Sequence, residues 1–410
     1  MRAMLACLFA LPVIATAAPW TFSEPVTVAG DGDHFHHLDG AGRRHVAAAD
    51  GAVALVWEDD RSGAPQVYLA TKPVDAADFG RIERLSDGAE AYEPAVVGLG
   101  GGRWLAAWEQ DGGVVARLVT PDGLGEVVAL ARTGARQVTL AAGSDRIAAV
   151  WARDSAGGQL LETADITVAH DALAVAAPVV PAPTAGEHPY QGFPSAAWAA
   201  DGALLIAWED RRAGHTRIFA TRRDASGAFA SETQLNEHNA PKVDGHEVVG
   251  LGSGVMRVML AADAKGGVRA IWLDKRNAAS GYAVWGAASD DNGVHYGANQ
   301  IVQDEHGGAV QQWHAALASG RPGFVAAWDD TREVWSDERE TGDVLLSWHA
   351  GDHWSEDLLV PGASGSGYQG SPALALDAQG GLHLTWIERD DLTSPSRLRY
   401  LQGRWQPDAQ

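Results

Sequence analysis

The stretch Leu205-Ile206-Ala207-Trp208-Glu209-Asp210 decides the fold, because its pattern of a short apolar strand ending in tryptophan and acidic residues recurs along the chain. Neighbouring copies lie 43 to 64 residues apart. Four short strands with their turns need about 40–50 residues, so each period accommodates one propeller blade. The recurrence predicts an all-β, seven-bladed β-propeller. The copies end at Trp57, Trp108, Trp151, Trp208, Trp272, Trp328 and Trp386.

Segments on either side of the repeated tryptophan also have the character of strands. Residues 66–71 show a period of two, which is typical of a strand with one buried face. Another short strand is expected at residues 81–85. The chain contains 48 glycines, which suits a fold with many tight turns. We therefore expect four antiparallel strands in each blade.

The two ends of the chain predict how the ring closes. The last repeat stops at Gln410 without an outermost strand, whereas residues 22–30 have the pattern of the fourth strand of the sixth repeat, residues 354–362. We expect the N-terminal strand to complete the last blade. It would then cover a strand edge that otherwise favours aggregation.

The N-terminus has the features of a signal peptide. Arg2 supplies a positive charge, residues 5–15 are apolar, and small residues follow up to Ala17. Residues 1–17 are therefore expected to be removed, leaving a single propeller domain over residues 18–410 in the periplasm or outside the cell. Cys7 is the only cysteine and would leave with this segment, so we expect no disulfide and no thiolate chemistry. No later stretch is apolar enough to predict a membrane-spanning helix.

Charge and motifs exclude several classes of function. The formal net charge is −22, which should repel nucleic acids and anionic membrane surfaces. The sequence contains no phosphate-binding loop, dinucleotide fingerprint, zinc-protease motif or serine-hydrolase elbow. We expect no cofactor, no nucleic-acid partner and no membrane insertion.

The turn after the repeated tryptophan follows the pattern Trp-x-Asp-x-Arg in four copies, at residues 57–61, 208–212, 272–276 and 328–332. Residues 289–296 read Ser-Asp-Asp-Asn-Gly-Val-His-Tyr, similar to a degenerate Asp box. With these features the chain resembles the sialidase-like (BNR/Asp-box repeat) propeller superfamily. Sialidases of that superfamily carry an early Arg-Ile-Pro motif and usually six blades. This sequence lacks the motif and predicts seven blades, so the resemblance implies the fold, and we expect no sialidase activity.

The Trp-x-Asp-x-Arg pattern itself is predicted to be structural. An aspartate and an arginine two residues apart on a tight turn can pair with each other and with backbone amides. The same pairing in four blades would shape each turn in the same way. The repeated tryptophans are expected in the core between blades, where large aromatic rings contribute most to burial.

A binding site is expected on the axial face that carries the loops leading into the innermost strands. Two of these loops match, Tyr190-Gln191-Gly192-Phe193-Pro194 and Tyr368-Gln369-Gly370-Ser371-Pro372. Aromatic faces together with arginine and glutamine donors suit a sugar, and an arginine fork suits an acidic sugar. The alternative is that the repeated motif only shapes the loop. The predicted ligand-binding residues are Tyr190, Arg257, Trp313, His314 and Tyr368.

The sequence predicts an exported glycan-interacting propeller, either a lectin-like binder or a carbohydrate-active enzyme. A glycoside hydrolase needs two carboxyl groups, for which Glu93, Glu187 and Glu247 are the candidates. A polysaccharide lyase needs a His or Tyr base and an arginine, for which His188, Tyr190, His314 and Arg257 are available. The alternative function is a non-catalytic scaffold for proteins of the cell envelope.

A group of histidines near the N-terminus is the remaining unusual feature. His34, His36 and His37 fall within four residues and are weak candidates for metal ligands. Their spacing matches no strong metal motif, so we predict no metal site there.

Overall fold

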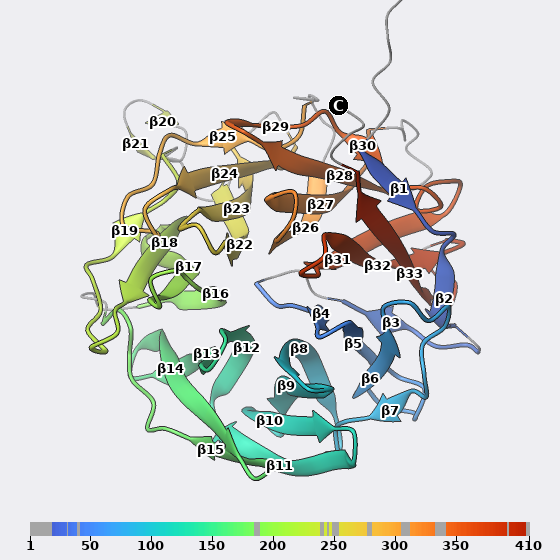
Figure 1. Cartoon of the computed structure of the whole chain (residues 1–410). Helices are drawn as coiled ribbons and strands as arrows, with labels where there is room; N and C mark the ends of the chain where they lie inside the picture. Colours follow the sequence, from blue (N-terminus) through green and yellow to red (C-terminus); the bar gives the residue numbers. More distant parts are fainter. Residues whose placement is uncertain are drawn as a thin grey trace, which may run out of the picture.

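The computed structural model describes residues 19–30, 32–38, 42–183, 189–237, 242–243, 246–247, 254–276, 281–304, 312–332, 342–391 and 393–406. Within these ranges every regular element is a β-strand, and no helix is present that could cross a membrane. The strands form seven blades around a central axis, as the sequence predicts (Figure 1). The seven-bladed propeller is therefore confirmed.

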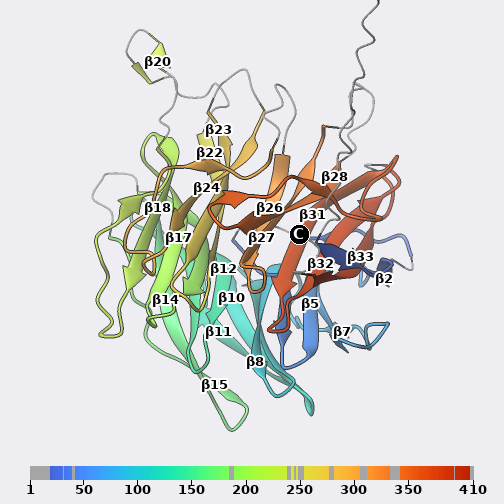
Figure 2. The same ribbon diagram turned by 45° about the horizontal axis from the view of Figure 1, so that its top comes forward.

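Each blade is an antiparallel sheet whose first strand lies nearest the axis (Figures 1 and 2). A separate hairpin, formed by β20 (Lys242–Val243) and β21 (His246–Glu247), lies between blades 4 and 5 in the chain. The first three blades contain β3 (His36–His37), β4 (Val46–Ala49), β5 (Ala52–Asp59), β6 (Gln66–Pro73) and β7 (Glu83–Arg84); β8 (Ala91–Gly100), β9 (Arg103–Gln110), β10 (Gly113–Thr120) and β11 (Gly123–Ala131); and β12 (Ala135–Ala142), β13 (Ile147–Ser155), β14 (Gly158–Ala169) and β15 (Ala172–Val175).

The other four blades continue the same order around the ring. They contain β16 (Gln191–Trp198), β17 (Leu204–Ala213), β18 (His215–Arg223) and β19 (Thr233–Gln234); β22 (Gly254–Ala262), β23 (Val268–Lys275), β24 (Ala283–Ser289) and β25 (Gln300–Ile301); β26 (Gln312–Ser319), β27 (Phe324–Asp330), β28 (Asp343–Ala350), β29 (His353–Trp354) and β30 (Leu358–Leu359); and β31 (Tyr368–Leu376), β32 (Gly381–Arg389) and β33 (Arg397–Trp405) with β1 (Trp20–Phe22) and β2 (Val26–Ala29).

The seven repeated tryptophans form the core between blades. Each of them is fully buried at 0% exposure. Each packs against the preceding blade: Trp272, for example, shares a cluster with Leu205 and Ala207 of blade 4. Burying a ring of this size stabilises the fold by roughly 4–6 kcal/mol, so the repeat supplies one large apolar contact at every blade boundary.

The turn after the tryptophan has the structural role that its pattern predicts. In blade 4 the buried carboxylate of Asp210 accepts hydrogen bonds from Trp208 Nε1 at 3.1 Å and from the Arg212 backbone N–H at 2.9 Å. Arg212 Nε also donates to this carboxylate at 2.9 Å. The corresponding contacts recur after Trp57 and Trp328, so the aspartate locks both the ring and the turn.

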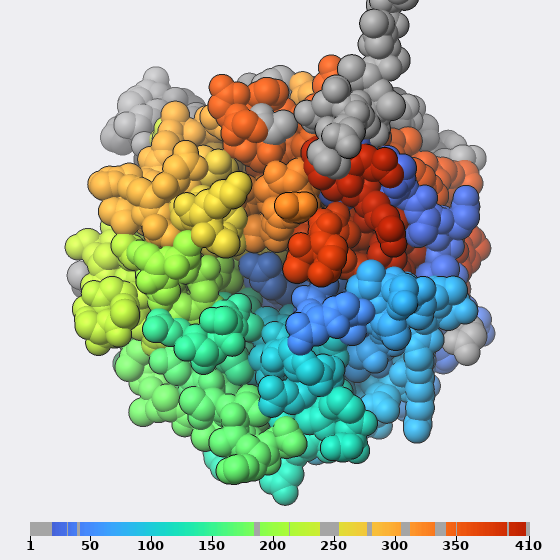
Figure 3. All heavy atoms as spheres, in the orientation of Figure 1, coloured from blue at the N-terminus to red at the C-terminus, as the bar shows by residue number. Residues whose placement is uncertain are grey.

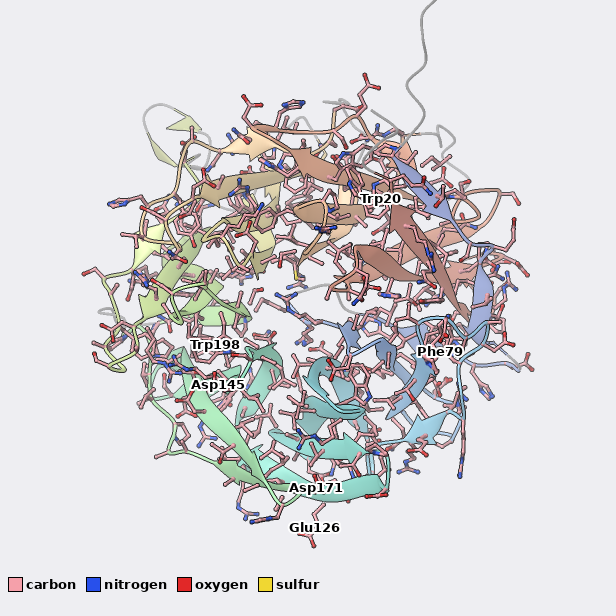
Figure 4. The ribbon with its side chains drawn as sticks, viewed as in Figure 1. Trp20, Phe79, Glu126, Asp145, Asp171 and Trp198 are labelled. Atoms are coloured by element: carbon pink, nitrogen blue, oxygen red, sulfur yellow. The ribbon has the colours of Figure 1, made fainter. Side chains whose placement is uncertain are left out.

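The N-terminal strand closes the ring, which confirms the predicted clasp. Both β1 and β2 pair antiparallel with β33, with Trp20 opposite Trp405 and Val26 opposite Tyr400. Trp20 is 4% exposed and lies on the outermost strand of blade 7 (Figure 4). Its ring meets those of Trp405 and Trp348 at centroid distances of 5.1 Å and 6.4 Å. The clasp therefore joins the two ends of the chain through strand pairing and a buried aromatic cluster.

Candidate functional site

The innermost strands share an irregularity where they begin. In blades 2 to 7 the register of the first strand against the second shifts after two or three residues. At each shift one non-glycine residue has a left-handed backbone, with φ between 47° and 60°. Such a conformation costs of order 1–3 kcal/mol, and its sixfold repetition marks these positions as a built feature of the axial face. The six residues are Glu93, Gln137, Phe193, Arg257, His314 and Ser371.

At three of these positions an acidic residue of the preceding blade holds the irregular backbone in place. In each case the carboxylate that directly follows the repeated tryptophan accepts the backbone N–H of the irregular residue in the next blade. Glu58 binds the Glu93 amide at 3.1 Å, and Glu209 binds the Arg257 amide at 2.8 Å. Glu109 accepts the Gln137 amide N–H in the same way at 2.6 Å. These inter-blade carboxylates were not predicted, although their signal is visible as an acid one residue after the tryptophan.

His314 lies in a polar cluster that joins blades 6 and 7. Its Nδ1 is 2.9 Å from Oδ1 and 3.1 Å from Oδ2 of Asp329, which directly follows Trp328. The Tyr368 hydroxyl lies 3.5 Å from Oδ2 of the same carboxylate. The His314 side chain is 39% exposed, whereas that of Asp329 is 6% exposed. A buried carboxylate thus orients an accessible imidazole and lies beside a phenol.

The environment of Tyr368 keeps its hydroxyl protonated. Burial, and after it the charge of Asp329, raises the pKa of Tyr368 above the ordinary value for tyrosine. The ring folds back over Gly370, where an added Cβ would lie 2.3 Å from the Tyr368 hydroxyl oxygen. Glycine at this place in the Tyr-Gln-Gly-x-Pro motif therefore makes room for the tyrosine. Gln369 of the same motif is also buried.

Arg257 lies in blade 5, where an aromatic ring and a carboxylate contact its guanidinium. Its guanidinium stacks on the Phe193 ring at 3.8 Å and is 3.6 Å from the carboxylate of Glu209. The side chain remains 33% exposed. A partly accessible guanidinium held by a ring and a buried carboxylate can still receive an anionic ligand.

The predicted aromatic residues divide between two places. Trp313 in blade 6 lies against Tyr282 of blade 5, with ring centroids 5.0 Å apart. These two blades also hold His314 and Arg257, respectively. Tyr190 instead lies under Arg211, whose guanidinium is 4.5 Å from its ring centroid. Trp313 therefore contacts blade 5, which also holds Arg257, while Tyr190 lies directly before the innermost strand of blade 4, with its hydroxyl close to Gly192.

A cavity of ≈ 390 Å³ opens between blades 7, 1 and 2. Glu93 pairs with the buried Arg43, which also lies 3.6 Å from Glu109. Burial, and after it the neighbouring Glu93, raises the pKa of Glu109 to about 7. The cavity is lined by Phe35, His36, His37, Glu58, Asp59, Asp60, Pro65, Tyr92, Glu93, Glu109 and Arg389.

The predicted histidine group does not come together as a metal centre in the part of the chain that the structure describes. His36 is 1% exposed, and its Nδ1 lies 3.0 Å from the Ser396 hydroxyl. Burial lowers the pKa of His36 to about 4, so it is neutral at ordinary pH. No cluster of three metal-ligating side chains occurs among the described residues.

Three of the predicted catalytic candidates cannot be assigned a position. Glu187 and His188 lie outside the described residues. Glu247 belongs to β21, but its side chain is outside the description. Glu93 is the only one of the four for which the structure gives contacts.

Comparison with known proteins supports the fold. No family model matches the sequence, and no curated protein matches it. The structure is similar to that of the polysaccharide lyase Uly1, with a TM-score of 0.54 and 9% identity over 89% of this chain and 90% of that chain. It is also similar to a protein of unknown function from Dyadobacter fermentans DSM 18053, with a TM-score of 0.52 and 12% identity over 94% and 99% of the two chains.

The sialidase of Trypanosoma rangeli matches at a TM-score of 0.48 and 9% identity, over 94% of this chain and 60% of that chain. All of these identities are low, so the likeness establishes the fold alone. The predicted resemblance is confirmed for the propeller fold, which the likeness to Uly1 supports.

Proposed function

We propose that the axial face binds an acidic polysaccharide and cleaves it by β-elimination, with His314 and Tyr368 as the proton-transferring groups. The observation that carries this proposal is the His314–Asp329–Tyr368 cluster, which joins an oriented imidazole to a protonated phenol through one carboxylate. From the predicted signal peptide we further propose that the protein acts outside the cytoplasm.

His314 suits the role of general base. A carboxylate at Nδ1 favours the tautomer in which Nδ1 carries the hydrogen, so that Nε2 has the lone pair. In a uronate the proton to be removed is on C5, next to the carboxylate. His314 would accept this proton, and the electrons of the C5–H bond would form a double bond between C4 and C5.

Tyr368 suits the role of general acid. When the C4–O bond breaks, the leaving oxygen needs a proton, and a phenol with a raised pKa is protonated at neutral pH. Arg257 completes the set because a guanidinium on the uronate carboxylate makes the C5 proton more acidic. Trp313 lies in the same region and offers a ring face to a neighbouring sugar.

Glycoside hydrolysis is supported less well by the described residues. That reaction needs two carboxyl groups about 5–9.5 Å apart on either side of the bond. Glu93 and Glu109 are hydrogen bonded to each other and so lie too close together to flank a glycosidic bond. Both are already engaged by Arg43.

The test is an assay of the mature protein on a panel of uronate-containing polysaccharides, followed by ultraviolet absorbance of the unsaturated product. We expect product with at least one member, and none from a standard sialoside. His314→Ala and Tyr368→Phe should each lower the rate by about 10²–10⁴-fold. His353→Ala, which alters an exposed histidine elsewhere in blade 6, serves as the control and should leave the rate unchanged.

Calorimetry on the same panel separates the remaining outcomes. Binding without product, weakened by about 1–3 kcal/mol in Trp313→Ala, would overturn the lyase and leave a lectin-like binder. If the panel shows neither binding nor product, the glycan site itself is overturned. The scaffold function, which is non-catalytic, would then be the better account.

A further inference from the structure

The central channel of the propeller contains a charged side chain that the proposed function does not use. A cavity of ≈ 230 Å³ runs between the innermost strands of blades 1 to 6 and is lined mainly by alanine and valine. Arg44 is the one charged residue in this lining. The cavity reaches the face that carries the turns between the first and second strands of the blades. On this face the space-filling view shows a hollow at the centre, with blue atoms of the N-terminal part of the chain at its bottom (Figure 3).

The segment that carries Arg44 is held rigidly across the channel. The Gly42 carbonyl accepts a hydrogen bond from the Thr139 hydroxyl of blade 3 at 2.8 Å. Gly42 also lies against blade 4, because an added Cβ would be 2.3 Å from the Pro194 carbonyl oxygen. The Arg44 carbonyl accepts from the Val96 amide of blade 2 at 2.8 Å. Blade 1 is therefore anchored to three other blades at this level.

Among the described residues, the Arg44 guanidinium makes one hydrogen bond and no salt bridge. Its Nη2 donates to the Leu260 carbonyl of blade 5 at 2.8 Å. The neighbouring Arg43, by contrast, is paired with Glu93 and Glu109. A guanidinium has five N–H donors and keeps its charge in proteins, and a cation in a low-dielectric interior is costly unless it is paired.

We propose that Arg44 binds a small monovalent anion in the central channel. The guanidinium supplies the charge and the donors that Leu260 leaves unused, and the apolar walls lower the local dielectric, which strengthens the interaction. The cavity is smaller than the 300–1,000 Å³ of typical ligand pockets, which suits a halide or a short carboxylate such as acetate and excludes an oligosaccharide. The bound anion would neutralise the one unpaired charge of the lining and tie blade 1 to blade 5.

The first test is crystallographic and uses the mature wild-type protein. Crystals soaked in sodium bromide should show an anomalous peak within hydrogen-bonding distance of the Arg44 guanidinium. Crystals soaked in sodium acetate should show a planar carboxylate there if the site prefers oxyanions. A water molecule alone at Arg44 in both soaks would overturn the proposal.

The second test follows the melting temperature at constant ionic strength while bromide or acetate replaces a large, weakly binding anion. Wild-type protein should melt about 2 °C higher when the bound anion is several-fold above its dissociation constant. Arg44→Gln, which keeps a donor for the Leu260 carbonyl but loses the charge, should show no rise. Arg81→Gln removes an exposed arginine and should behave as wild type.

An equal rise in all three proteins would show that the anion acts elsewhere, and would overturn the proposal. If Arg44→Gln does not fold, the bromide peak in the wild type decides the question. Neither test depends on the polysaccharide site, because that site lies on the opposite face.

Discussion

Replacing Trp20 by alanine tests whether the N-terminal clasp stabilises the whole ring. Trp20 is 4% exposed and packs on Trp405, Trp348 and Phe22, with centroid distances of 5.1, 6.4 and 6.3 Å. Replacing a buried tryptophan by alanine typically costs about 3–5 kcal/mol. The loss should fall near the upper end, because the change also loosens the strand that covers the edge of β33.

The measurement is urea unfolding followed by circular dichroism. We expect the free energy of unfolding of Trp20→Ala to fall by about 5 kcal/mol relative to the mature wild type. Phe35→Ala is the matched control, since its ring is 42% exposed and its replacement should cost under about 1 kcal/mol. Parallel detection in the near and far ultraviolet checks that the transition remains two-state.

One result would refute the reasoning. If Trp20→Ala loses less than about 1 kcal/mol while the slope against urea is unchanged, the clasp is not part of the cooperative fold. A new early transition of small amplitude would indicate instead that the clasp opens alone. The ring would then be stable without it.

Two further predictions concern carboxylates of the axial face and its turns. Glu109 has a pKa of about 7 in the folded protein, above its ordinary value, so its proton stabilises the fold fully below about pH 4.5 and this stabilisation is lost as the pH rises through 7. Glu109→Gln keeps an acceptor for the Gln137 amide. Its melting temperature should vary less between pH 5 and 8 than that of the wild type, and its free energy of unfolding should be higher by about 1–3 kcal/mol at pH 8. An unchanged pH profile would contradict this. Asp210→Ala should lower the free energy of unfolding by about 3–5 kcal/mol in urea titrations, because it leaves Arg212 and the Trp208 N–H without their buried acceptor. Asp210→Asn should lose less, and equal losses in the two variants would show that the hydrogen bonds are not what matters.

The sequence alone determined those features that depend on a short stretch repeated along the chain. The apolar strand ending in tryptophan predicts the blade count, because each copy must bury its ring against a neighbour. The contacts of the aspartate in the turn are equally local, because Asp210 binds Trp208 and Arg212, which are each two residues away. The clasp could be predicted because an incomplete last repeat and a spare first strand can be counted.

The candidate site could be predicted only in part. The loops leading into the inner strands can be found by counting back from the tryptophans, which located Arg257, Trp313, His314 and Tyr368. Their partners could not be found in this way. Asp329 lies 39 residues before Tyr368, and no local pattern indicates that one carboxylate meets both His314 and a tyrosine of the next blade.

Contacts across the ring were decided by the tertiary structure alone. Arg44 meets the Leu260 carbonyl 216 residues away, and Glu58 meets the Glu93 amide across a blade boundary. The physical reason is that a repeat describes one blade and its immediate packing, whereas closure of the ring sets which blades face each other over the axis. Side chains at the centre are therefore brought together by ring geometry, which no single period of the sequence contains.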